Sequence, residues 1–242
     1  MLNKPHNLRS LLVVIEREAS LPPVLLLDLI KLTITCDNED DWPRLFHEAT
    51  FGKSESVTFY PRSKQIGDFL GAFERAALSS SLQNMLSKFR HSTPYPWNPG
   101  CSSLVPFTQM VDLDIKSSYN DGCSSRVDDD IVINLLRAML KLKILGLDDD
   151  PCHQFTTGVT AKGFVASVLR CPDLYVLRMQ FQMDSFNAPP TSPEMTPDAG
   201  SAASWADCAL TEFAAEERPM PEGSAVTIGL TLLRIFPRID SI

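Results

Sequence analysis

The chain has 242 residues, of which 44% are hydrophobic and 21% are charged, so it is long enough to bury a sizeable core. Its 22 basic and 30 acidic residues give a formal net charge of −8. This acidity argues against nucleic acids and anionic membranes as partners, because basic surface supplies most of the affinity for both.

The sequence contains no apolar run of the roughly 18 residues that a membrane-spanning helix needs. The apolar stretch 11–15 is followed at once by Glu16, Arg17 and Glu18, so it is too short for a secretory signal. The six cysteines are widely spaced and form no Cys-x-x-Cys pair, a pattern typical of free thiols. We therefore expect a cytoplasmic or nuclear protein.

A short apolar phrase recurs along the chain: an apolar residue, two free places, an apolar residue, one free place and an apolar residue. Its last two apolar places alternate as in a half-buried β-strand. The clear copies are Leu29-Leu32-Ile34, Met110-Leu113-Ile115, Leu142-Leu145-Leu147 and Leu174-Leu177-Met179. Weaker copies begin at Leu8, Ser54, Leu86 and Leu210, and Ile239 with Ile242 opens one more. Leucine-rich repeats usually run about 20–29 residues, so the widest steps indicate long units or insertions.

Helical patterns lie between these copies, as a strand–helix repeat requires. Apolar residues at helical spacing predict helices over 64–78, 129–140, 160–170 and 222–236, and a short helix is predicted over 41–46. The helix at 129 begins with aspartates suited to an N-terminus. The helix at 160 begins with a threonine cap and ends at Cys171-Pro172. Repeated strand–helix units favour parallel strands with helices on one side.

Two segments interrupt this rhythm. Residues 91–103 contain three prolines and are expected to form a loop. Residues 184–207 are rich in proline, serine, threonine and alanine and are expected to be a flexible insertion. In that insertion Ser192 and Thr196 precede prolines and are candidate phosphorylation sites.

These patterns predict a single α/β domain over residues 1–242. We expect a leucine-rich-repeat-like solenoid of about eight irregular units, with parallel strands on one side and helices on the other. The chain begins almost on a unit and stops inside one, whereas exposed solenoid ends usually need polar caps. We therefore expect the domain to be truncated at one or both ends.

Five segments carry a family resemblance: Asp41–His47, Ser56–Arg62, Thr157–Gly163, Cys171–Leu174 and Leu230–Arg238. They resemble the leucine-rich-repeat region of fungal F-box proteins, and the resemblance extends from about Leu26 to Ile242. The Cys-Pro-Asp-Leu-x-x-Leu phrase that begins at Cys171 makes the resemblance more specific, because this phrase joins the end of a helix, a proline that stops the helix and the start of a strand.

The resemblance implies a non-catalytic protein-recognition module, similar to the substrate-binding part of an F-box subunit of a cullin-type ubiquitin ligase. In that family an N-terminal F-box docks on the ligase adaptor and the repeats hold the target. Here residues 21–30 resemble the start of an F-box in outline, but the second helical part is missing or degenerate. Adaptor and cullin are therefore implied partners only if an F-box is present, and a stand-alone binding scaffold is the alternative.

The predicted binding surface is the exposed side of the strands, at places 3, 5 and 7 of each phrase, where positions align from unit to unit. The candidate protein-binding residues are Lys88, Arg90, Asp112, Asp114, Lys116, Asp148, Arg178, Gln180 and Glu212, with Val176 among them as an apolar position. Mixed charge suits protein recognition, where it sets specificity and encounter rate. For each residue the alternative is an ordinary solvated strand position.

The patterns that suggest metal binding are weak. His47-Glu48 has Phe51, not a second histidine, four residues after His47. The acidic run 37–41 is followed by Trp42 where a calcium loop requires glycine. The acidic triplets 128–130 and 148–150 are best explained as a helix start and a strand exit, with a joint cation site as the alternative.

The patterns that suggest catalysis are no stronger. Cys152 and His153 are adjacent, so on a strand or helix their side chains point apart. The sequence contains neither a Gly-x-Gly-x-x-Gly motif nor a phosphate-binding loop. We expect no enzymatic activity, metal or cofactor. A hydrolase or metal enzyme remains the alternative, and it would need a pocket that joins Cys152, His153 and an acidic triplet.

Overall fold

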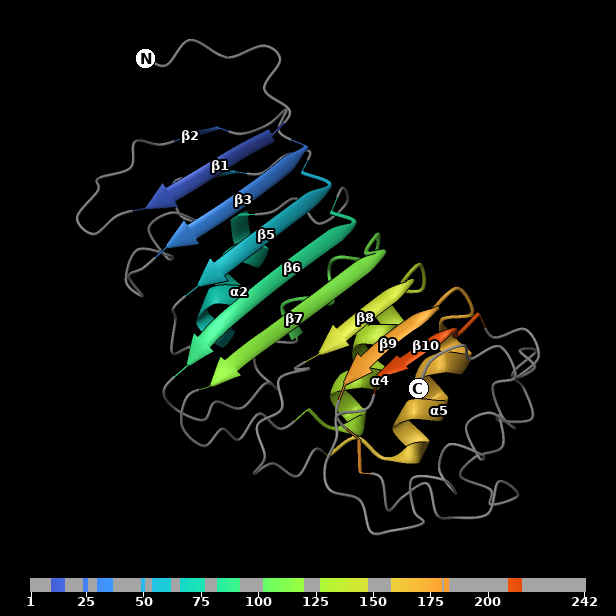
Figure 1. The fold of residues 1–242 in the computed structure, drawn as a ribbon. Helices are drawn as coiled ribbons and strands as arrows, with labels where there is room; N and C mark the ends of the chain where they lie inside the picture. The colour runs from blue at the N-terminus through green and yellow to red at the C-terminus, as the bar shows by residue number, and fades with distance from the viewer. Residues whose placement is uncertain are drawn as a thin grey trace.

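Eight parallel strands form one sheet whose strand order follows the chain (Figure 1). They are β1 (Ser10–Ile15), β3 (Lys31–Cys36), β5 (Ser56–Pro61), β6 (Asn84–His91), β7 (Asp112–Tyr119), β8 (Ile144–Leu147), β9 (Val176–Met179) and β10 (Glu212–Ala214). A separate parallel pair consists of β2 (Val24–Leu25) and β4 (Ala49–Thr50). The computed structural model describes residues 10–15, 24–25, 30–36, 49–50, 54–61, 66–76, 82–91, 102–119, 127–147, 158–179, 181–182 and 209–214.

The register of the sheet confirms most of the recurring apolar phrase. The first residues of successive strands are Cα partners: Ser10 with Lys31, then Ser56, Asn84, Asp112, Ile144, Val176 and Glu212. This alignment bears out the phrases that begin at 8, 29, 54, 110, 142, 174 and 210. The class is thus α/β with a parallel sheet, as predicted.

The phrase that was expected to begin at Leu86 was placed four residues too late. Met85 is the partner of Leu113, so the unit begins at Leu82, and both Leu82 and Met85 are buried. Ser87 occupies the third apolar place and pairs with Ile115. The third apolar place is polar whether the phrase begins at Leu82, which puts Ser87 there, or at Leu86, which puts His91 there. The apolar pattern alone therefore does not distinguish the two starting points.

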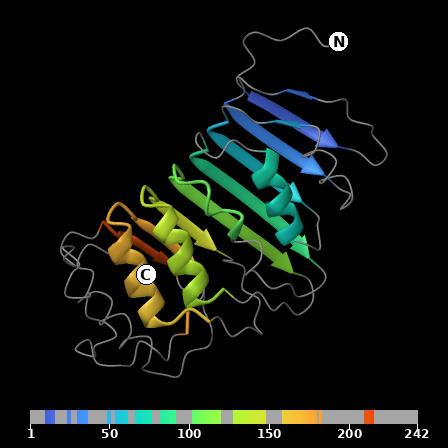
Figure 2. The same ribbon diagram turned by 180° about the vertical axis from the view of Figure 1, so that it is seen from behind.

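Within the described residues, three helices cover one face of the sheet, which is clear when the molecule is seen from front and back (Figures 1 and 2). They are α2 (Ile66–Ala76), α4 (Asp129–Ala138) and α5 (Ala161–Arg170). These confirm the helices predicted over 64–78, 129–140 and 160–170. The helices predicted over 41–46 and 222–236, and the insertion predicted over 184–207, lie outside the described residues.

The core lies between the helices and the inward-facing strand positions. Buried strand residues are Val57, Phe59, Met85, Leu113, Ile115, Leu145, Leu147, Leu177 and Met179, and buried helix residues include Leu70, Phe73, Ile131, Leu135, Leu136, Phe164 and Val168. Phe73 of α2 meets Phe59 of β5 edge to face, with ring centroids 5.0 Å apart, and stacks on Phe107, with ring centroids 5.4 Å apart. Aromatic contacts of this kind add to the free energy of burial, so α2 is fixed on the sheet.

The starts of successive strands are joined by a repeated hydrogen-bond pattern. Two consecutive N–H groups donate to one carbonyl of the preceding strand start, at N–O distances of 2.6–3.2 Å. The donor pairs and acceptors are Glu55 and Ser56 to Ile30, Gln83 and Asn84 to Glu55, Val111 and Asp112 to Gln83, Lys143 and Ile144 to Val111, and Tyr175 and Val176 to Lys143. The same local geometry therefore recurs at each of these junctions.

Two aspartates at the start of α4 connect it to α5. Asp128 caps α4, because its Oδ1 accepts the Ile131 N–H at 2.9 Å. Asp129 reaches the next unit, where its two carboxylate oxygens accept the N–H and the hydroxyl of Thr160, each at 2.7 Å. The Thr160 oxygen in turn accepts the Gly163 N–H at 3.5 Å, which confirms the predicted threonine cap.

Glycines leave room for both of these aspartates. A Cβ on Gly158 would lie 2.8 Å from the Cβ of Asp128, and a Cβ on Gly163 would overlap the carboxylate of Asp129. Neither contact would be tolerated without a shift of the neighbouring atoms. The close approach of α4 to α5 therefore depends on glycine at these positions.

We predict that Gly163→Ala lowers the free energy of unfolding by roughly 1–3 kcal/mol, because the new Cβ displaces the Asp129 carboxylate from Thr160. Gly71→Ala in α2 is the matched control. A Cβ there meets no atom closer than 3.6 Å, so it should stabilise the protein by about 0.5–1 kcal/mol. Urea denaturation followed by circular dichroism measures both changes.

The contact with Asp129 is tested by combining substitutions. In an Asp129→Ala background, Gly163→Ala should become neutral or stabilising, as Gly71→Ala is. An equal loss of stability from Gly163→Ala in both backgrounds would show that another neighbour causes the strain.

Candidate functional site

The face of the sheet opposite the helices carries the candidate site (Figure 1). Side chains alternate along a strand, so positions between the buried residues share this open face. Its first row is Ser10, Lys31, Ser56, Asn84, Asp112, Ile144, Val176 and Glu212, and its second row is Leu12, Thr33, Thr58, Leu86, Asp114, Gly146, Arg178 and Ala214. We call these two rows and their continuation along the strands the open face.

The predicted binding residues that fall in described strands all lie at open-face positions. They are Lys88 and Arg90 in β6, Asp112, Asp114 and Lys116 in β7, Arg178 in β9, and Glu212 in β10. The four-residue error at Leu86 did not move Lys88 or Arg90 to the other face, because four is an even number of residues. Asp148 and Gln180 lie outside the described residues, and Val176 is buried although it belongs to the first row.

The structure brings Asp112, Asp114 and Arg178 together around a glycine. Asp114 is the partner of Gly146, and Gly146 is the partner of Arg178. A Cβ on Gly146 would lie 2.5 Å from Oδ1 of Asp114, so the carboxylate leans over the glycine and this oxygen is buried there. Gly146 thus lets the acid extend across β8, towards the strand that carries Arg178.

The electrostatics of this cluster are unbalanced. Burial raises the pKa of Asp112, the neighbouring negative charge of Asp114 raises it further, and the positive charge of Arg178 opposes both. The positive charge of Arg178 thus lowers the pKa of Asp112 less than burial and Asp114 raise it.

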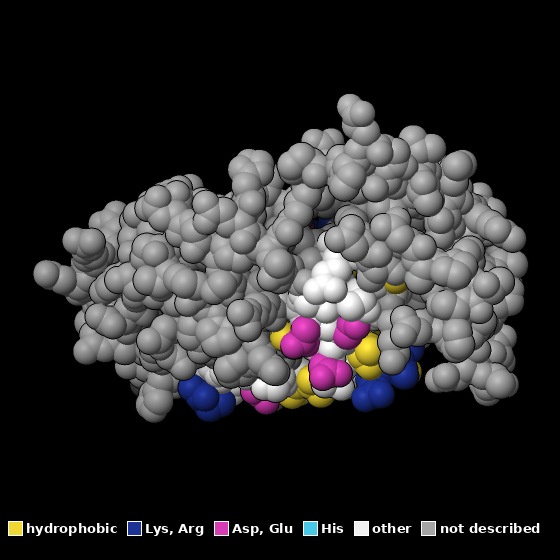
Figure 3. Space-filling model, turned by 90° about the horizontal axis from the view of Figure 1, so that it is seen from below, with side chains coloured by type: hydrophobic (Ala, Val, Ile, Leu, Met, Phe, Trp, Pro, Cys, Tyr) yellow, Lys and Arg dark blue, Asp and Glu magenta, His cyan; other side chains and the backbone are white. Residues whose placement is uncertain are grey.

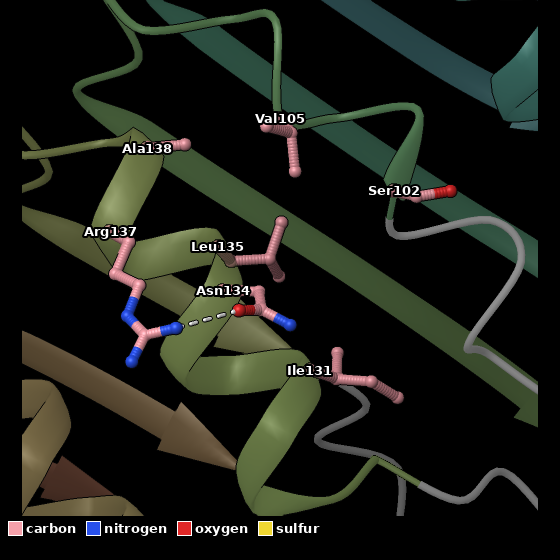
Figure 4. Close-up of a pocket in the computed structure, with 7 residues that line it drawn as sticks. All are labelled: Ser102, Val105, Ile131, Asn134, Leu135, Arg137 and Ala138. Atoms are coloured by element: carbon pink, nitrogen blue, oxygen red, sulfur yellow. Dashed lines mark hydrogen bonds between the residues drawn. The ribbon is translucent and has the colours of Figure 1, made fainter.

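Sequence reasoning missed a groove of about 450 Å³ on the helix side. It is lined by Ser102, Val105, Ile131, Asn134, Leu135, Arg137 and Ala138, and it lies between α4 and the turn segment that precedes β7 (Figure 4). Val105 and Leu135 approach each other across it, while Arg137 donates a hydrogen bond to Asn134 at 3.3 Å. Its described lining offers apolar surface and one cation, but no acid, histidine or cysteine. The proline-rich stretch before residue 102 was the available signal, since it indicated a unit with little helix.

The acidic triplet 128–130 is a helix start, as predicted, and two of its carboxylates are engaged in hydrogen bonds within the fold. Seen from below, acidic side chains gather on the described surface, with hydrophobic and basic side chains beside them (Figure 3). Within the described part of the chain, no group of three or more His, Cys, Asp and Glu side chains is placed to hold a metal ion. The other candidate residues, His47, Cys152, His153 and the triplet 148–150, lie outside the described residues.

Cys171 is buried at the junction of α4 and α5. Its thiol donates to the last carbonyls of α4, with Sγ 3.5 Å from the Met139 oxygen and 3.8 Å from the Leu136 oxygen. Burial raises the pKa of Cys171 to about 12, which Arg170 opposes and Asp173 reinforces. The thiol therefore stays protonated at neutral pH and acts as a helix-end donor, not as a nucleophile.

No protein-family model matches the chain, and neither does any curated protein. The assignment of a site therefore depends on the geometry above. None of the described helices is long and apolar enough to cross a membrane.

We predict that Asp112→Asn stabilises the protein at pH 7, by less than about 1 kcal/mol because solvent screens a half-exposed group. The raised pKa of Asp112 means that the folded protein holds this proton more tightly than the unfolded chain. The ordinary pKa of an aspartate is 3.8, and the charge of Asp112 lowers the free energy of unfolding as pH rises above this value. The stability gained by Asp112→Asn should therefore shrink as pH falls towards 3.8. Urea denaturation at pH 7 and pH 4.5 measures the difference, with exposed Asp130→Asn as the control. A destabilised Asp112→Asn protein at pH 7 would contradict this assignment.

We predict that Cys171 resists iodoacetamide at pH 8 in the folded protein and reacts in 6 M urea, because its pKa of about 12 leaves almost no thiolate. Mass spectrometry of tryptic peptides identifies the modified cysteine. The raised pKa also predicts that stability falls above about pH 9.0, where the thiol of the unfolded chain ionises first. Cys171→Ala should remove this part of the pH dependence. Rapid labelling of Cys171 by iodoacetamide in the folded protein would contradict the assignment of this thiol as buried and hydrogen-bonded.

Proposed function

We propose that this chain is a leucine-rich-repeat-like solenoid that recognises other proteins through the open face and performs no chemistry of its own. The observation that carries the proposal is the open face itself: its polar and charged positions are aligned in register, and the described helices lie on the opposite side. A broad, aligned surface of mixed charge suits a protein target better than a small molecule, which needs an enclosed pocket.

The strand order supports the solenoid. Each strand between β1 and β10 pairs with the strand of the unit before it and with the strand of the unit after it, which is how stacked repeats bury a common core. The steps between equivalent residues grow from 21 between Ser10 and Lys31 to 36 between Val176 and Glu212, so the units lengthen along the chain. This accounts for steps longer than those of ordinary leucine-rich repeats, about 20–29 residues.

The resemblance to fungal F-box proteins supports a more specific role, as the substrate-binding part of an F-box subunit of a cullin-type ubiquitin ligase in the cytoplasm or nucleus. Docking on the ligase adaptor would require an F-box. Val24 and Leu25, which lie where the resemblance to an F-box begins, form β2 and pair with Ala49 and Thr50. This extended pairing favours a stand-alone binding scaffold as the second candidate function.

We predict that Thr58→Arg combined with Leu86→Arg reduces partner capture about tenfold or more, because two bulky cations then occupy the centre of the open face. Thr108→Arg combined with Leu140→Arg is the matched control, since both residues are exposed and lie outside the strands. Affinity purification from cells with quantitative mass spectrometry compares the two variants with the parent protein. Thermal denaturation checks that the two double variants are equally stable. Identical partner sets for both variants would reject the open face as the binding surface.

The same purification separates the two candidate roles. Recovery of a cullin and its adaptor together with the targets supports a ligase subunit. Targets that depend on the open face, recovered without cullin or adaptor, support the stand-alone scaffold.

A further inference from the structure

We propose that the groove beside α4 is a second protein-binding site, which takes the apolar face of a short amphipathic helix of a partner and pairs a carboxylate of that helix with Arg137. The groove lies on the helix side of the sheet, opposite the open face. The inference therefore goes beyond the proposed function and does not depend on it.

The groove has an apolar interior with two walls. One wall is the side of α4 that carries Ile131, Leu135 and Ala138, and the other is the turn segment that carries Val105 (Figure 4). Val105 is 38% exposed, although its neighbour Leu104 is fully buried. Covering an exposed apolar side chain gains free energy in proportion to the area removed from water, so this rim favours an apolar group of a partner.

The size of the groove matches the face of a short helix. A cavity of about 150 Å³ holds a benzene molecule, so a volume of about 450 Å³ has room for roughly three groups of that size. Ile131 and Ala138 are separated by seven residues of α4, a length of about 10 Å. A partner helix places three apolar side chains over the same length, at positions i, i+4 and i+7. A groove with two walls suits such a helix better than a small molecule, which needs to be enclosed on most sides.

Arg137 gives the groove its preference for an acid. Its guanidinium donates one hydrogen bond, to Oδ1 of Asn134 at 3.3 Å, and a guanidinium has five N–H donors. Both side chains are exposed and line the groove, so further donors of Arg137 are accessible to a carboxylate beside the apolar face of a bound helix. The described lining contains no acidic side chain that would compete for these donors.

A basic residue in the last turn of a helix also offsets the helix dipole, and this is the alternative role of Arg137. Arg75 in α2 and Arg170 in α5 occupy the same place in their helices. A dipole role alone predicts that the three arginines behave alike, whereas the proposed site predicts that only Arg137 affects the binding of an acidic helix.

The test uses the full chain and fluorescent alanine-based peptides of about 14 residues, a length at which helix begins to form in water. The acidic peptide carries leucines at i, i+4 and i+7 with flanking glutamates, a second peptide has lysines in place of the glutamates, and a third has the acidic composition in scrambled order. Fluorescence anisotropy measures the dissociation constants. We expect the acidic peptide to bind about threefold more tightly than the lysine peptide and about tenfold more tightly than the scrambled one. Because the chain has a net charge of −8, long-range attraction works against this preference, which therefore reports a local cation.

Two substitutions assign the site. Arg137→Gln should weaken binding of the acidic peptide about threefold without weakening that of the lysine peptide. Val105→Glu places a charge at the apolar rim and should weaken both about tenfold or more. The controls are Arg75→Gln, at the same place in α2, and Tyr175→Glu, at a side chain that is 39% exposed outside the groove, and neither should change binding. Thermal denaturation checks that the variants fold, and Arg137→Gln decides alone if Val105→Glu is less stable.

The inference is overturned if the scrambled peptide binds as well as the acidic one, if Arg75→Gln weakens binding as much as Arg137→Gln does, or if no peptide binds at about 1 mM. Decanoate that displaces the acidic peptide more effectively than unlabelled peptide does would assign the groove to a small amphiphile, and this would also overturn it. The open-face variant Thr58→Arg with Leu86→Arg should leave peptide binding unchanged, and loss of binding there would place the peptide on the open face instead. Failure of the groove leaves the proposed function to its own test, since that test measures capture through the open face.

Discussion

The pair of N–H groups that donates to one carbonyl at the starts of β5, β6, β7, β8 and β9 is the constraint on which this part of the sheet depends. It is repeated from the junction of Ile30 with Ser56 to the junction of Lys143 with Val176. Because it fixes each strand from β5 to β9 against the one before it, residues of these units fall into common rows. A slip of one residue would move Asp112 and Asp114 to the helix side and bury two charges. The register thus creates both the core and the open face.

A second constraint acts between the units that contain β7 and β8, where three aspartates each contact a glycine of the next unit. The pairs are Asp114 with Gly146, Asp128 with Gly158 and Asp129 with Gly163. Two of them position α4 against α5, and the third lies on the open face beside Arg178. The contact that sets the spacing of these units therefore also sets the position of one carboxylate of the candidate site. Fold and site are coupled at Asp114.

Sequence patterns predicted the elements whose apolar residues repeat at a fixed spacing and missed those without a repeat. The helices that begin at Ile66, Asp129 and Ala161 were predictable because a continuous apolar stripe faces the sheet. Strands β2 and β4 have two residues each, too few for any periodicity. The groove beside α4 depends on how Val105 packs, which spacing does not encode. Gly146 offered an overlooked signal, since a glycine inside a strand often marks the close approach of another group.

The raised pKa of Asp112 distinguishes this residue from an ordinary solvated strand position. A solvated carboxylate keeps its usual pKa and costs the fold nothing, whereas the pKa of Asp112 is raised by burial and by Asp114. Asparagine or threonine would fit a half-exposed strand position without that cost, and Asn84 of β6 and Thr58 of β5 occupy such positions. An acid that destabilises its own surroundings contributes most when a partner supplies the missing positive charge. The charge of Asp112 therefore does not stabilise the sheet, which agrees with the place of this residue in the proposed binding surface.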